Sequence, residues 1–129
     1  MNVLPMKRGT FASMESLTIE VMTPCNSGFF MFDHQDGKIV RVRCRIGKNG
    51  GCARASLDTM AHIMTIALTA GAEIEEISKT LVGVCCANAP RWDTHEQRLI
   101  FSCHEAMGIA INEALRILDQ DRAGLAESA

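Results

Sequence analysis

The sequence has almost no net charge and no long apolar run. Thirteen Lys and Arg residues stand against 15 Asp and Glu, which gives a formal charge of −2 at pH 7. This balance argues against an extended nucleic-acid surface, because such binding needs many neutralised phosphates. No segment is apolar enough to span a bilayer, and the start, "MNVLPMKRGTF", lacks the apolar core and cleavage site of a signal peptide. We therefore expect a cytoplasmic protein with no membrane partner.

The sequence also lacks the common signatures of catalysis. The Gly-x₄-Gly-Lys-Ser/Thr order of a Walker A loop is absent, and no Ser-His-Asp or paired-carboxylate spacing is evident. No internal repeat or low-complexity linker divides the 129 residues, a length that suits one domain with a modest core.

Alternating apolar and polar residues predict an antiparallel sheet in the first third of the chain. Strands are expected over 16–22, 29–33 and 38–46. The Asp-Gly pair of "HQDG" between the last two is a hairpin signal. The third strand carries three arginines on one face. Its apolar face comprises Val40, Val42, Cys44 and Ile46.

Three amphipathic helices are predicted after the strands, over 56–72, 73–83 and 102–118. Ser56 and Ser102 are candidate N-caps, and Asp58 is expected in the first turn of its helix. Glu105 occupies the capping-box position that matches Ser102. Residues 84–98 have the composition of a polar connector, and Trp92 within it is a candidate for stacking or for an interface.

Strands followed by helices predict an α+β fold. We expect a two-layer sandwich in which an antiparallel three-stranded sheet is followed by about three helices on one face. The expected organisation is a flexible N-terminal arm over 1–15, a single domain over 16–118 and a frayed tail over 119–129.

Several pieces of the sequence together resemble the TSCPD domain. These are the turn "GKNGGC", the Gly-Ala end of the first helix, the Gly-x-x-Cys segment in "LVGVCC", and "SCHEA" where the family has Ser-Cys-Pro-Asp-Ala. The similarity spans roughly residues 16–118. The chain differs at His104 and Glu105, which replace the Pro-Asp of the motif, and it has no Cys-x-x-Cys tail after the last helix.

The resemblance implies an accessory role rather than a complete enzyme. TSCPD domains occur near the C-terminus of adenosylcobalamin-dependent, class II ribonucleotide reductases and also as standalone proteins. The radical cysteine and cobalamin site of such a reductase need a barrel that does not fit in this chain, so we expect no cobalamin site and no catalysis by this chain alone. The partners expected are a ribonucleotide reductase or a nucleotide-like ligand. Two alternatives remain open: a homo-oligomeric sponge or regulator that binds a nucleotide-derived small molecule, and a thiol redox carrier.

The six cysteines are candidates for metal binding or redox chemistry, because clustered cytosolic thiols are more often functional than disulfide-forming. The alternative is that most of them are small buried hydrophobic residues. Four of them match cysteine positions of the family, and together they would suit tetrahedral zinc. This candidate metal set comprises Cys25, Cys52, Cys86 and Cys103. His95 or His104 could replace one thiolate, and Cys44 is expected in the core. The adjacent Cys85 and Cys86 also permit a strained, easily reduced disulfide, or simple packing.

Basic residues gather on the third strand and at the glycine-rich turn after it. The turn leads into a helix N-terminus, where free backbone N–H groups favour phosphate, and its glycines allow close backbone approach. The candidate anion-binding or nucleotide-binding set comprises Arg41, Arg43, Arg45, Lys48, Gly50, Gly51 and Arg54. The simpler explanation of the arginine row is a solvated sheet face with mixed cross-strand charge pairs, for example with Glu20, because exposed charged strand faces are common.

Overall fold

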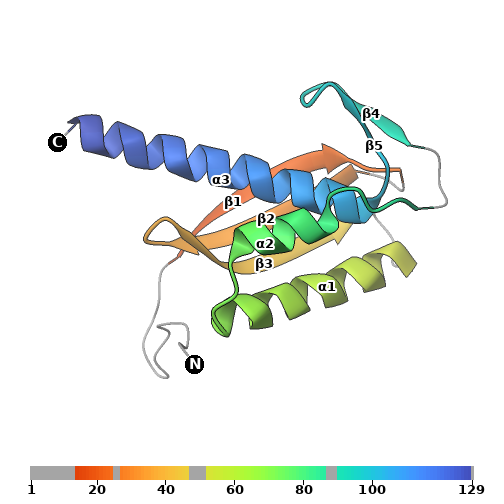
Figure 1. Cartoon of the computed structure of the whole chain (residues 1–129), viewed down its shortest axis with the longest axis horizontal. Helices are drawn as coiled ribbons and strands as arrows, with labels where there is room; N and C mark the ends of the chain where they lie inside the picture. Colours follow the sequence, from red (N-terminus) through yellow and green to blue (C-terminus); the bar gives the residue numbers. More distant parts are fainter. Residues whose placement is uncertain (1–13, 25–26, 47–51, 87–89, 129) are drawn as a thin grey trace.

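A computed structural model of the chain describes residues 14–24, 27–46, 52–86 and 90–128, without the side chains of 52–54 and 125–128. The elements are β1 (Glu15–Met22), β2 (Ser27–Gln35), β3 (Lys38–Ile46), α1 (Cys52–Thr69), α2 (Ile74–Leu81), β4 (Arg91–Asp93), β5 (Arg98–Ile100) and α3 (Cys103–Ser128). A three-stranded sheet followed by three helices confirms the expected α+β class (Figure 1). None of the helices in the described part is long and apolar enough to cross a membrane.

The sheet is antiparallel throughout, with the strand order β1-β2-β3. The predicted hairpin turn between β2 and β3 is confirmed at Asp36 and Gly37, whose φ angles are 54° and 77°. Two consecutive positive φ angles give the turn the twist that suits a two-residue hairpin, and Asp-Gly adopts them readily.

A register shift in the β2–β3 pair changes which β3 residues face the core. Asp33 pairs with Arg41, whereas the next residue, His34, pairs with Ile39. Val40 is therefore the extra residue of a bulge. Ile39 is buried in the core and Val40 is only half-buried. The prediction that Val40 begins the apolar face of this strand is therefore wrong, and Ile39 takes that place.

The helices pack on one face of the sheet (Figure 1). Helix α1 packs along β3, α3 packs across β1 and β2, and α2 packs against α3. Alternate residues of the strands point into this layer, and Phe30 and Phe32 of the central strand have no exposed surface. The opposite side of the sheet, which we call the open face, carries the remaining alternate side chains of the three strands.

Three segments differ from the sequence expectation. Helix α1 begins at Cys52, so Ser56 and Asp58 lie inside the helix and not at its start. Helix α3 continues to Ser128, well past the expected end at 118. The expected connector contains a two-stranded hairpin, β4–β5, whose strands are only three residues long and too short for a periodic signal.

Candidate functional site

Several cysteine-bearing segments meet at one end of the sheet, which we call the cysteine end. It is the end where β1 finishes, β2 starts and β3 finishes, as the pairings of Met22 with Ser27 and of Gly28 with Ile46 show. Cys103, the first residue of α3, is buried there. Its Sγ lies 3.3 Å from Thr23 Oγ1, just beyond the end of β1.

Two further cysteine segments reach the same end. The backbone N–H of Cys86 donates to the carbonyl oxygen of Phe101 at 3.0 Å, two residues before Cys103. Helix α1 starts at Cys52, after β3 has left the sheet at this end, and then runs back along β3. Figure 1 places the starts of α1 and α3 together with the end of β3 at one side of the molecule. Cys25 and the side chain of Cys52 lie outside the described residues.

The buried carboxylate of Glu105 ties these segments together. Its Oε2 accepts a hydrogen bond from Gly83 N at 2.7 Å, and its Oε1 accepts one from Phe101 N at 3.1 Å. Arg98 of β5 forms an ion pair with Oε1 at 3.0 Å. The expected N-cap is confirmed, because Ser102 Oγ accepts from Glu105 N at 2.9 Å. The Glu105 side chain bonds Phe101 N rather than the Ser102 N–H of an ordinary capping box.

The remaining described cysteines differ in their surroundings. Cys44 lies on β3, and its Sγ is 3.7 Å from Asp58 Oδ1 of α1. Burial, followed by the nearby Asp58 charge and this hydrogen bond, raises the pKa of the Cys44 thiol to about 12. A thiol that stays protonated is a poor metal ligand and a poor nucleophile. Cys85 is exposed next to Cys86.

Two of the predicted anion-binding arginines are already paired with a carboxylate. Arg41 Nε contacts Asp33 Oδ2, and Arg43 Nη2 lies 2.9 Å from Asp33 Oδ1. Asp33 is only 2% exposed although it points to the open face. Burial alone would raise the pKa of Asp33, but hydrogen bonds from Arg43, Arg41 and Ser16 hold it below the ordinary value. The cross-strand charge pair therefore accounts for much of the arginine row.

Arg45 differs from the other two arginines because it has no ion-pair partner among the described residues. It is exposed at the end of β3, opposite Phe29 of β2, which is 40% exposed. Lys48, Gly50 and Gly51 lie outside the described residues, as does the side chain of Arg54. Of the three arginines of the predicted anion site that the structure describes, Arg45 is therefore the one without an ion-pair partner in the described part of the chain, and it lies beside an aromatic ring at the cysteine end of the open face.

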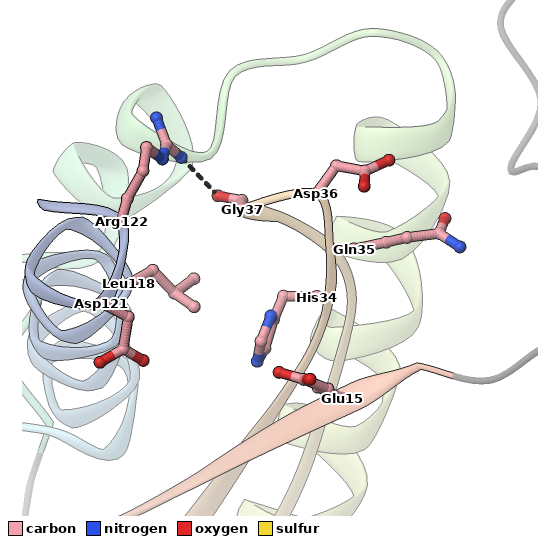
Figure 2. Close-up of a pocket in the computed structure, with 8 residues that line it drawn as sticks. All are labelled: Glu15, His34, Gln35, Asp36, Gly37, Leu118, Asp121 and Arg122. Atoms are coloured by element: carbon pink, nitrogen blue, oxygen red, sulfur yellow. Dashed lines mark hydrogen bonds between the residues drawn. The ribbon is translucent and has the colours of Figure 1, made fainter. Parts of the chain in front are cut away.

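A pocket of about 610 Å³ lies at the opposite end of the molecule, between the β2–β3 turn and α3 (Figure 2). Arg122 spans it by donating to the carbonyl oxygen of Gly37 at 3.1 Å. Glu15 and His34 form one wall, and Asp121 faces them from α3. Three carboxylates, of Glu15, Asp36 and Asp121, outnumber the single guanidinium of Arg122 in this pocket. The resulting negative charge disfavours a nucleotide-like anion.

His95 lies in the turn between β4 and β5 and contacts α3 far from Cys103. Its Nε2 is 3.5 Å from Glu113 Oε1, and Glu113 is about 15 Å along the helix from Cys103 at 1.5 Å per residue. His95, Glu96 and Glu113 could together offer metal ligands. However, Arg116 hydrogen-bonds both carboxylate oxygens of Glu113, which explains the group as an ion-pair network.

Trp92 is exposed on the β4–β5 hairpin. It is 56% exposed and pairs across the hairpin with Leu99, which is 42% exposed. Its position fits a surface contact better than a lid over the core.

Replacing Asp33 by Asn should destabilise the protein by about 1–3 kcal/mol at neutral pH, because two charge-assisted hydrogen bonds are lost. A lowered folded-state pKa means that the stabilisation is present above the unfolded pKa of about 4 and is lost as the pH falls through the folded value. Urea unfolding at several pH values should therefore show a difference that shrinks in acid. Glu75→Gln, a matched carboxylate-to-amide change at an exposed position of α2, is the control. Equal stability at neutral pH, or a difference that does not change in acid, would contradict this account.

Replacing the buried Glu105 by Gln should cost about 1–3 kcal/mol, because an amide NH₂ must then face one of the two backbone N–H donors, of Gly83 or Phe101, and both groups lose their hydrogen bond. The Arg98 ion pair is lost as well. Chemical denaturation measures the change. Glu76→Gln is the matched control, since its pair with Lys79 is exposed on α2 and worth little. If both variants unfold at the same denaturant concentration, the contacts of Glu105 with Gly83, Phe101 and Arg98 do not stabilise the fold.

Comparison with known proteins agrees with the sequence motifs. The family model for the TSCPD domain matches residues 11–115, which is most of the chain. No curated protein and no solved structure is significantly similar to it. The "SCHEA" segment that resembles the family motif is the start of α3, where Ser102 caps the helix, Cys103 meets Thr23 and Glu105 holds Gly83 and Phe101. The chain belongs to the TSCPD domain family.

Proposed function

We propose that this chain is a cytoplasmic accessory module of ribonucleotide reduction, which binds a ligand or partner and holds one zinc ion at its cysteine end. Family membership supports the link to ribonucleotide reductases, since TSCPD domains occur in such enzymes. In this proposal the chain serves deoxynucleotide synthesis through binding, and a reductase supplies the radical chemistry.

The convergence of cysteine segments carries the zinc proposal. The starts of α1 and α3, and the segment after α2 whose Cys86 N–H donates to the Phe101 carbonyl oxygen, each bring one candidate ligand to the cysteine end. Cys25 is two residues beyond Thr23, whose hydroxyl oxygen lies beside the Cys103 sulfur. Four thiolates are a donor set that zinc prefers, and burial of Cys103 with exposure of Cys86 leaves one side of such a centre accessible. Glu105 would act as a positioning residue, because it anchors the Gly83 turn that precedes Cys86 to the start of α3.

Metal analysis tests this proposal directly. Protein purified without added zinc should contain about one zinc per chain. Cys86→Ser should lose the metal, and because this side chain is exposed the variant should still fold. Cys44→Ser should retain the metal, since its protonated thiol lies on β3 beside Asp58. Metal-free protein, or equal metal loss from Cys44→Ser, would overturn the zinc site. Six free thiols before and after mild reductant would exclude the redox-carrier alternative.

A second candidate activity, nucleotide binding, is favoured by Arg45 and Phe29. A guanidinium beside an exposed ring can pair with phosphate while the ring stacks on a base. Lys48, two residues after β3, would add a second cation. Because Arg41 and Arg43 are held by Asp33, this proposal assigns them a supporting role and gives ligand contact to Arg45.

Nucleotides should therefore raise the melting temperature, in proportion to the logarithm of concentration above Kd. Arg45→Ala and Lys48→Ala should each remove most of this shift. Lys79→Ala, at an exposed position of α2, should leave it unchanged. The absence of any shift with ribonucleoside and deoxyribonucleoside phosphates would count against nucleotide binding, without bearing on the zinc site.

A further inference from the structure

The open face has a different chemistry on each of its strands. Three successive rungs run from β1 through β2 to β3: Glu20, Phe29 and Arg45; Thr18, Met31 and Arg43; Ser16, Asp33 and Arg41. The β1 edge is polar to acidic, the central strand is largely apolar, and the β3 edge is basic. The charge of the face therefore changes sign from one edge to the other.

We propose that the open face binds the open face of a second copy of this chain, with a two-fold axis parallel to the strands. Such an axis exchanges the two edges, so β1 of one copy lies over β3 of the other at the usual sheet separation of about 10 Å. Residues of the same rung keep the same height along the strand. Glu20 therefore meets Arg45 of the second copy twice, once on each side of the axis, and Phe29 packs near its own equivalent.

The other simple two-fold arrangement is disfavoured by charge. An axis perpendicular to the strands would place β3 over β3 and set one arginine row against another. A nucleic acid is also a poorer occupant, because the three arginines of this face are opposed by two carboxylates, Asp33 and Glu20, and two of the arginines are held by Asp33. The distribution of charge thus selects a second copy and one orientation of it.

The contacts within one chain prepare this surface. Ser27 Oγ donates to Glu20 Oε2 at 3.2 Å and orients the carboxylate at the cysteine end of the face. Phe29 is 40% exposed, which is a large fraction for an aromatic side chain on a central strand. Asp33, which lies near the proposed axis, is neutralised by Arg41 and Arg43, so two copies do not bring bare carboxylates together.

The size of the face sets the strength expected. Three strands of eight or nine residues cover roughly 400 Å² at ordinary strand spacing and rise. This is about half of the ~800 Å² per partner of a standard interface. We therefore expect a weak dimer with Kd in the micromolar range or above.

Sedimentation equilibrium of the whole chain from micromolar to millimolar concentration tests the proposal. The natural chain should self-associate reversibly to a dimer. Glu20→Lys and Arg45→Glu should each weaken dimerisation at least about tenfold, because like charges then face each other, and the double variant should restore it. Asp119→Lys makes the same charge change as Glu20→Lys at an exposed position of α3, and it should leave the dimer dissociation constant unchanged. A monomer at all concentrations, an equal effect of the control, or failure of the double variant to recover would overturn the proposal.

This inference does not rest on the proposed zinc site, but it shares Arg45 with the proposed nucleotide site. Glu20→Lys separates the two, because it removes the pairing partner and leaves the Arg45 guanidinium intact. The variant should lose self-association and keep any nucleotide-induced rise in melting temperature. Loss of both together would overturn the assignment of Glu20 to the interface.

Discussion

The buried carboxylate of Glu105 is the constraint on which the rest of the cysteine end depends. A carboxylate that is almost without solvent must be compensated, and here two backbone N–H groups and one guanidinium do so. These partners come from the turn after α2, from Phe101 two residues before α3, and from β5. A single side chain therefore fixes where α3 starts relative to three other segments. Because α3 covers β1 and β2, that start also determines how the helical layer sits on the sheet.

The sheet itself separates two kinds of surface. Its covered face packs Phe30 and Phe32 against the helices, and its open face carries the Asp33 charge cluster and Phe29. Asp33 needs its arginines because it is shielded from water on a face that is otherwise accessible. The consequence is that Arg41 and Arg43 are committed within the chain, and Arg45 is the arginine of this row that is exposed without a partner among the described residues. The three arginines look equivalent in the sequence, but Asp33 on the neighbouring strand pairs with two of them and leaves the third exposed.

Much of the fold could be predicted from the sequence because its signals are local. Alternation gave the three strands, Asp-Gly gave the β2–β3 turn, and Ser102 gave the start of α3. The bulge at Val40 could not be predicted, because it depends on the pairing of β3 with β2 and leaves no trace in alternation alone. The role of Asp33 was missed for the same reason. Glu105 was noticed as a capping residue, but its bond to Gly83 joins positions 22 residues apart, which local patterns do not encode. The cysteine set came from family resemblance rather than spacing, and the sheet topology explains why the described segments of Cys86 and Cys103 meet at one end.

The proposed zinc site and the proposed self-association surface lie at the same end of the sheet, and they are therefore physically connected. The rung of Glu20, Phe29 and Arg45 lies at the cysteine end of the sheet, two residues before the β1 terminus. Ser27, which orients Glu20, follows Cys25 closely in the chain, and Thr23 on the other side contacts Cys103. The metal proposed at Cys25 and Cys103 would therefore hold the residues that immediately precede Ser27. Any free energy that holds this segment in place also orients the carboxylate proposed to face a second copy. Zinc occupancy and self-association would then be thermodynamically linked, with each favouring the other.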